Sequence, residues 1–229
     1  MRSHIDAIIP SLSSDQLIPG AWLDRATTVQ GAVLPPTHPV HRTRRIAVDL
    51  GEGVGRDSTA ILVRDDHGIL DLNAGNSLSL ADAAEEIARF ARIYNVDSSR
   101  ISYDKLGIGR DFHHHLVRRG LKDAIGYAGS GRPQDPKAFT NLRTEAAWKL
   151  RRRLNPDWAL DPRAPLATRQ HPFHIPARGW WPILREDIEA LTYDLVGSQT
   201  RLIKKEDLLI RLGRSPDRGD ALIQSFAFD

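Results

Sequence analysis

Three apolar runs follow one another closely in the first third of the chain and predict three successive strands. They cover residues 44–50, 58–66 and 68–75, and short polar or glycine-containing turns separate them. Connections this short join antiparallel neighbours, because parallel strands need a crossover of about a dozen residues or more. The pattern therefore predicts an antiparallel meander.

Helical and strand-like periods alternate after the meander. Ala84, Ile87 and Ala91 recur at helical spacing, and Ser79 and Asp82 precede them as a capping box. We therefore expect a helix over 79–95, a strand over 100–104, a helix over 107–120 and a strand over 123–130. This order predicts an α/β fold in which helices flank a mixed sheet.

The two ends of the chain differ from this central part. Residues 1–43 contain a short helical stretch and then a proline-rich extended segment, so we expect them to be a lead-in or linker. The globular domain is expected over residues 44–229. Its second half should contain helices over 139–154, 181–196 and 216–228 and a strand over 200–205.

The composition is that of an ordinary folded domain with a basic surface. The chain has 229 residues, no cysteine and a formal net charge of +3, and its pI is near 9.4. The absence of cysteine excludes disulfides and thiolate metal sites. No apolar run approaches the roughly 18 to 20 residues that span a bilayer, and we see no secretion signal. Arginine clusters such as Arg151–Arg153 are suited either to solvent or to phosphate groups.

Aspartates lie where strands end and where the last helix begins. Asp49 and Asp104 each end an apolar run and precede glycine-rich turns, and Asp217 and Asp220 open the last predicted helix. Carboxylates brought together in this way suit hard divalent cations. Two such ions side by side can promote in-line attack on a phosphodiester. The residues therefore indicate a metal-dependent nuclease.

The order of these motifs resembles the nuclease domain of the large terminase subunit of tailed bacteriophages. The lead-in LIPGAWLDRA also resembles the segment that joins motor and nuclease in those proteins, so the similarity spans nearly the whole chain. The motifs are Asp49 with its glycine-rich turn, Asp104-x-x-Gly107-x-Gly109, Phe139-x-Asn141-x-Arg143 and Gly213-Arg-Ser-Pro216-Asp217-x-x-Asp220-Ala-Leu.

The resemblance implies an RNase H-like fold, with an antiparallel meander of three strands followed by parallel strands. It implies an endonuclease that cuts double-stranded viral DNA with little sequence preference during genome packaging, using two Mg²⁺ or Mn²⁺ ions. Asp49, Asp104 and Asp220 would be the catalytic metal ligands, with Asp57 and Asp217 as auxiliary ligands.

The same resemblance implies partners that the chain does not contain. Complete large terminases carry an ATPase motor with a Walker A loop, and no such motif occurs here. We therefore expect the chain to be either an isolated nuclease domain or a protein that works beside a separate packaging motor. The small terminase subunit and the portal are expected as further partners, in the cytoplasm of the infected bacterial host. No membrane partner is expected. Double-stranded DNA would be contacted by Lys105, Arg110, Arg143 and Lys205.

Other functions remain open from the residues alone. The segment AVDLGEGVGRDSTAIL resembles the phosphate-binding hairpin of actin-like ATPases and phosphotransferases, although no second half of such a protein is present. A Holliday-junction resolvase or a transposase-type nuclease would have the same fold and would prefer branched DNA. A DNA-binding domain without activity is the third alternative.

Overall fold

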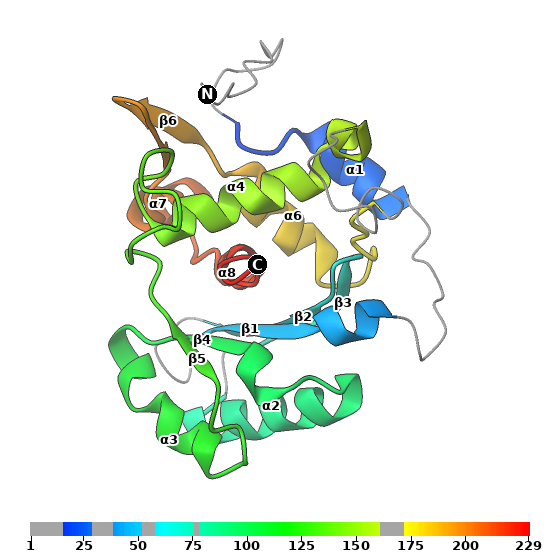
Figure 1. Cartoon of the computed structure of the whole chain (residues 1–229), viewed down its shortest axis with the longest axis vertical. Helices are drawn as coiled ribbons and strands as arrows, with labels where there is room; N and C mark the ends of the chain where they lie inside the picture. The colour runs from blue at the N-terminus through cyan, green and yellow to red at the C-terminus, as the bar shows by residue number, and fades with distance from the viewer. Residues whose placement is uncertain (1–15, 29–38, 52–57, 76–77, 161–171) are drawn as a thin grey trace.

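A mixed sheet forms the centre of the molecule and separates two layers of helices (Figure 1). The computed structural model describes residues 16–28, 39–51, 58–75, 78–160 and 172–229. Within these residues the sheet has five strands in the order β3-β2-β1-β4-β5. The strands are β1 (Arg45–Asp49), β2 (Thr59–Arg64), β3 (Ile69–Gly75), β4 (Ile101–Asp104) and β5 (Ile125–Tyr127).

The sheet topology confirms the predicted meander followed by parallel strands. β2 pairs antiparallel with both β1 and β3, whereas β4 lies parallel to β1 and β5 lies parallel to β4. All six residues of β2 are buried, because helices cover both faces of the sheet. A strand covered on both faces is expected to be a nearly continuous apolar run.

One helical layer is formed by α2 (Leu80–Tyr94) and α3 (Phe112–Val117). Ser79 caps α2 as expected, since its side chain accepts a hydrogen bond from the Asp82 backbone N–H. The expected helix over 107–120 is instead a 3-10 helix, Gly107–Arg110, followed by the shorter α3. A further 3-10 helix, Ser98–Arg100, precedes β4.

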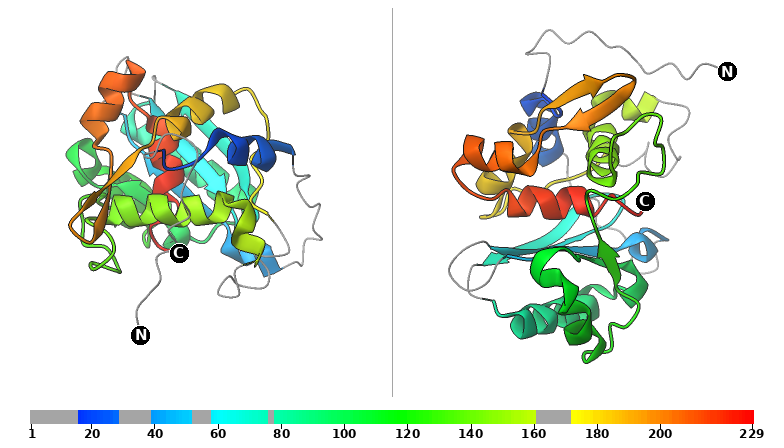
Figure 2. Two further views of the ribbon diagram at one scale, coloured as in Figure 1. Left: turned by 90° about the horizontal axis from the view of Figure 1, so that it is seen from above. Right: turned by 90° about the vertical axis from the view of Figure 1, so that its left-hand side faces the viewer.

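The opposite face of the sheet is covered by α8 (Asp217–Gln224), which lies directly on β1 and β2. Outside it lie α1 (Gly20–Thr28), α4 (Leu142–Leu154) and α6 (Trp181–Glu189), as the right-hand view of Figure 2 shows. Two further 3-10 helices are Pro39–Thr43 and Pro156–Leu160. None of the described helices combines the length and the apolar character that a membrane crossing requires.

Arg64 fastens the C-terminal end of α8 to the sheet. Its side chain is 1 % exposed and donates to Ser225 Oγ over 2.8 Å and to the Ser225 carbonyl over 2.7 Å. Its guanidinium also lies over the Phe226 ring, 3.7 Å from the ring centre, and pairs with Asp229. A buried guanidinium needs such partners, because an unpaired charge in the interior is costly.

The described part of the lead-in packs on the rest of the fold. Leu17 donates its backbone N–H to Leu191 over 2.8 Å, and Leu23 of α1 is completely buried. Ile175 donates to the Ala26 carbonyl over 3.0 Å, so α1 is also bonded to the segment before α6. Residues 16–28 therefore share a core with the part of the chain that begins at residue 44. The expected boundary at residue 43 stays a prediction.

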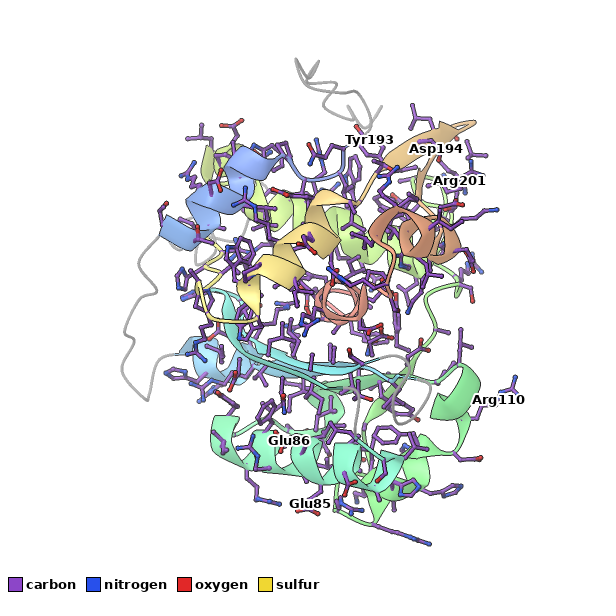
Figure 3. All side chains as sticks on the ribbon, turned by 180° about the vertical axis from the view of Figure 1, so that it is seen from behind. Glu85, Glu86, Arg110, Tyr193, Asp194 and Arg201 are labelled. Carbon is purple, nitrogen blue, oxygen red and sulfur yellow. The ribbon has the colours of Figure 1, made fainter. Side chains whose placement is uncertain are left out.

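The segment expected to be one helix over 181–196 is a helix followed by a strand. β6 (Tyr193–Val196) pairs antiparallel with β7 (Gln199–Leu202) around the two-residue turn Gly197–Ser198, in which Gly197 has φ +62°. Such a turn requires a positive φ, which glycine adopts without steric cost. Asp194 and Arg201 pair across the hairpin and lie together in Figure 3. α7 (Lys205–Leu212), which the sequence did not predict, follows β7.

Candidate functional site

Asp49 and Asp104 lie on the same edge and the same face of the sheet. β1 and β4 are parallel with Val48 opposite Tyr103, so the aspartates end neighbouring strands at one edge. Asp49 pairs with Ala60, whose side chain belongs to the core beneath α8. Ser102, two residues before Asp104, accepts a hydrogen bond from Gln224 of α8. Because side chains alternate along a strand, both aspartates face the α8 layer.

Lys205 lies between the carboxylates of Asp49 and Asp220. Its Nζ is 2.9 Å from Asp220 Oδ2 and 3.4 Å from Asp49 Oδ2. The two carboxylates are largely buried, with side chains 7 % and 11 % exposed, whereas the lysine side chain is 43 % exposed. One accessible cation therefore joins two buried anions.

Arg143 holds the other oxygen of Asp220. Its Nη2 and Nε donate to Asp220 Oδ1 over 2.9 Å and 3.2 Å, and its Nη1 donates to the Ile203 carbonyl over 2.9 Å. The guanidinium comes from the first turn of α4, and Asp220 from the first turn of α8. Arg143 therefore ties α8 to both α4 and the segment that leads into α7.

The electrostatics of these groups differ because their partners differ. Burial raises the pKa of Asp49 well above its usual range, and the nearby anions Asp220, Asp217 and Asp104 raise it further against the attraction of Lys205. Burial acts in the same direction on Asp220, but Arg143 and Lys205 outweigh it and lower the pKa of this carboxyl. Burial alone would lower the pKa of Lys205, and Asp49 and Asp220 raise it instead.

Asp104 is held by the turn that follows it. Its Oδ1 accepts the Leu106 N–H over 2.9 Å, and burial raises the pKa of this half-buried carboxyl. A Cβ on Gly109 would lie 1.8 Å from the Asp104 carbonyl oxygen, so only glycine permits this close approach. Gly107 adopts φ +55°. The two glycines after Asp104 are therefore required by the shape of the turn.

The other expected site residues lie at different places. Asp217 is buried and accepts the backbone N–H of Ser58 over 2.9 Å, which ties the start of α8 to the approach to β2. Asp57 lies outside the described residues. Lys105 and Arg110 are exposed next to Asp104, and Figure 3 shows Arg110 projecting away from the ribbon.

Sequence reasoning missed which cations pair with the carboxylates of Asp49 and Asp220. Arg143 and Lys205 were expected at the DNA, yet in the structure both pair with Asp220. Their expected contact with DNA stays a prediction, as do the roles of Asp49, Asp104 and Asp220. Across the described part of the chain, no three acidic or histidine side chains are spaced to hold one metal ion. A lysine at the end of the strand predicted over 200–205 carries no local signal of such pairing.

Comparisons with known proteins identify relatives of the fold. No family model and no curated protein matches the sequence. Among solved structures, the nuclease domain of the large terminase subunit of bacterial virus Sf6 is 18 % identical, with a TM-score of 0.74 over 92 % of this chain and 98 % of that domain. A mutant of the Sf6 domain solved with manganese and beta-thujaplicinol has a TM-score of 0.73 at 17 % identity, over 92 % of this chain and 98 % of that one.

The likeness extends to a second phage. The large terminase nuclease from thermophilic phage G20c, solved with bound magnesium, is 12 % identical and has a TM-score of 0.57 over 95 % of this chain and 98 % of that one. These proteins share the meander, the parallel strands and the flanking helices expected for this chain. The chain therefore has the RNase H-like fold of the nuclease domains of bacteriophage large terminase subunits.

Proposed function

We propose that this protein is a metal-dependent endonuclease that cleaves double-stranded viral DNA during genome packaging. One observation carries the proposal: Asp49 and Asp220, from a strand end and a helix start, converge on a single cation, Lys205. Asp104 lies on the same edge and face of the sheet. The similarity of fold to terminase nuclease domains, several of them solved with divalent metals, supports the same function.

The donor set fits hard divalent cations. Asp49, Asp104 and Asp220 offer carboxylate oxygens, the ligands that Mg²⁺ and Mn²⁺ prefer. Lys205 marks the point between two of them where positive charge is favoured. Because the Lys205 ammonium lies between the carboxylates of Asp49 and Asp220, it has to move away when a metal ion binds between them. Its side chain is accessible enough to do so.

The metal ions would lower the pKa of the attacking water and relieve charge on the phosphate and the leaving oxygen, which is the two-ion mechanism proposed here. Other groups of the chain orient the carboxylates that would hold the ions. Arg143 keeps Asp220 in place from the side opposite Lys205, and the Leu106 N–H orients Asp104. Asp217 and Asp57 are proposed as auxiliary ligands, although Asp217 is already bonded to the Ser58 N–H.

DNA would approach the exposed side of the three carboxylates Asp49, Asp104 and Asp220. Lys105 directly follows Asp104 and is exposed, and Arg110 is exposed one turn further on. Contacts of such side chains with phosphates orient a duplex without reading its bases, which agrees with low sequence preference. Lys205 and Arg143 would add positive charge within the site. The packaging motor, small terminase subunit and portal in the host cytoplasm are proposed partners.

The test is cleavage of supercoiled plasmid by the purified chain. We expect nicked and linear products with millimolar Mn²⁺ or Mg²⁺ and none with EDTA. Linear duplexes of unrelated sequence should be cut at similar rates, and ATP should not raise the melting temperature. Failure to cut with any divalent cation would refute the nuclease proposal. Preferred cleavage of a four-way junction would favour the resolvase-type alternative, and stabilisation by ATP would favour the actin-like one.

Replacing Lys205 with methionine is expected to lower the melting temperature in EDTA and to strengthen Mn²⁺ binding roughly tenfold, a difference of about 1.4 kcal/mol. The variant leaves Asp49 and Asp220 without their shared cation, so their repulsion destabilises the fold until metal binds. Melting temperatures and calorimetric titrations with Mn²⁺ at pH 8 measure both effects.

Lys204→Met is the matched control, because Lys204 is the adjacent lysine, is exposed and has no ion pair with either carboxylate among the described contacts. It should behave like the wild type. Equal Mn²⁺ affinities in the wild type and in Lys205→Met would show that Lys205 does not compete with metal.

A further inference from the structure

The first turn of α8 has no cap of its own. Pro216 is its N-cap residue and makes no side-chain hydrogen bond to the helix. The first backbone N–H groups of a helix have no partner within it, and an N-cap side chain usually accepts from the second or third of them. In α8 the third residue is Gly219, and its N–H donates to Asp187 Oδ2 over 2.9 Å. A side chain of α6 therefore replaces the missing cap.

The contact between α6 and α8 is close at this point. Asp187 is completely buried, and Gly219 is buried against it. A Cβ on Gly219 would lie 2.7 Å from the Asp187 Cβ, which is closer than two carbon atoms approach without a shift. The close approach of Asp187 therefore explains why a glycine stands in the segment Ser-Pro-Asp-Arg-Gly-Asp. The short distance between Gly219 and Asp187 also limits how far α8 can shift relative to α6.

Arg214 neutralises the buried carboxylate. Its Nη1 pairs with Asp187 Oδ1, so both oxygens of Asp187 are bonded. Its Nη2 donates to Glu186 Oε2 over 2.9 Å and to the Ile183 carbonyl over 3.3 Å. A buried carboxylate with two charge-assisted bonds is held in one position. If Arg214 is removed, Asp187 is left as an uncompensated buried charge.

We propose that Asp187 and Arg214 form a positioning brace that sets the place of Asp220 in the candidate metal site. The Gly219 N–H that Asp187 accepts belongs to the Arg218–Gly219 peptide. This hydrogen bond therefore fixes the chain one residue before the Cα from which the Asp220 side chain extends. Asp217, in the same first turn, is bonded to the Ser58 N–H. Neither Asp187 nor Arg214 is bonded to Asp49, Asp104 or Lys205, and their role is to orient α8. The inference rests on the proposed function, because it concerns the ligand Asp220.

The brace has a measurable consequence for metal binding. Residues that hold a metal ligand in place typically contribute about 10- to 100-fold to affinity or activity. Asp187→Ala should therefore weaken Mn²⁺ binding, measured calorimetrically, by roughly 10- to 100-fold. It should lower kcat while leaving KM for DNA unchanged, because Lys105 and Arg110 remain in place. Burial raises the pKa of Asp187 to about 6, so pH 8 keeps the wild-type side chain ionised.

Three further variants separate positioning from general damage. Asp187→Asn retains an acceptor for the Gly219 N–H and should recover most of the Mn²⁺ affinity. Glu186→Gln removes an exposed carboxylate that binds the same arginine, and should leave both affinity and kcat unchanged. Arg214→Lys keeps the charge but loses the planar fork, and should weaken Mn²⁺ binding to an intermediate degree. It serves in place of Asp187→Ala if that variant does not fold.

Hydrogen exchange of the amides of residues 219–221, measured without metal or DNA, tests the brace independently of nuclease activity. Exchange should be faster in Asp187→Ala and Arg214→Lys than in the wild type, and unchanged in Glu186→Gln. Wild-type exchange and wild-type Mn²⁺ affinity in a folded Asp187→Ala or Arg214→Lys variant would overturn the brace. A wild-type chain that neither binds Mn²⁺ nor cuts DNA would instead refute the nuclease proposal, whatever the exchange result.

Discussion

Replacing Asp49 with asparagine is expected to abolish metal-dependent plasmid cleavage without unfolding the protein. Asp49 ends the strand that pairs with both β2 and β4, and it contacts the cation that also pairs with Asp220. An amide offers one neutral oxygen in place of a charged carboxylate and binds a hard cation far more weakly. The loss should exceed the roughly 100-fold upper range observed when only a supporting group is removed.

The Asp49→Asn substitution is expected to abolish activity without lowering the stability of the fold. The folded protein raises the pKa of Asp49 chiefly through burial, so ionisation of this carboxyl is less favourable in the folded than in the unfolded chain. A group whose folded-state pKa is raised destabilises the fold once the pH exceeds its unfolded pKa. At pH 8 the asparagine variant should therefore melt no lower than the wild type.

Thermal melting and plasmid cleavage with Mn²⁺ measure these two effects on the same preparation. Asp123→Asn is the matched control, because Asp123 is exposed and precedes β5, at the opposite edge of the sheet from Asp49. It should leave cleavage unchanged. Wild-type cleavage by Asp49→Asn would remove Asp49 from the mechanism.

Replacing Leu23 with alanine is expected to destabilise the whole domain by about 2–5 kcal/mol, the usual cost of truncating a buried leucine. Leu23 is completely buried, and its helix α1 packs against α4. A total stability of about 5–15 kcal/mol is typical, so the loss is a large fraction of it. In a domain of this size the melting temperature should fall by about 2–4 °C for each kcal/mol. Removal of residues 1–38 should be more severe still.

Denaturant and thermal unfolding of the full chain measure this effect. Arg25→Ala is the control on the exposed face of α1 and should change stability by no more than about 0.5 kcal/mol. If a chain that begins at residue 39 melted like the full chain, the N-terminal segment would be a separate linker, as the sequence pattern indicates. A lowered melting temperature would place residues 16–28 within the folding unit.

The placement of the two strand-end aspartates could be predicted because its causes are local. Each follows an apolar run and precedes glycines, and parallel neighbours end at the same edge of a sheet. The cap at Ser79 was equally readable, since it depends on a few adjacent residues. The last helix was predicted over 216–228 and begins one residue later, at Asp217, without a side-chain cap from its own N-terminus. Local preferences also agree with the final fold over most of the sheet.

The segment 181–203 shows where the local pattern was insufficient. Its apolar residues fit a helix and a strand about equally over short stretches, which is a known ambiguity of periodicity. Strand β6 is selected by its partner β7 and by the turn at Gly197, and most of its residues are exposed. Because these residues are exposed, β6 lacks the alternation of apolar and polar residues that would have distinguished a strand from a helix.

The sequence by itself determined the order of the strands and helices as far as α4, the mixed sheet, and the set of carboxylates available to a metal. These depend on periodicity and on turn residues, which act over a few positions. Only the tertiary structure decided that Lys205 lies between Asp49 and Asp220, that Arg143 holds Asp220, and that α1 joins the core. Such pairings bring together side chains far apart in the chain. They follow from how the helices pack on the sheet. A carboxylate that becomes buried there needs a cation beside it, and no local sequence pattern specifies which cation that is.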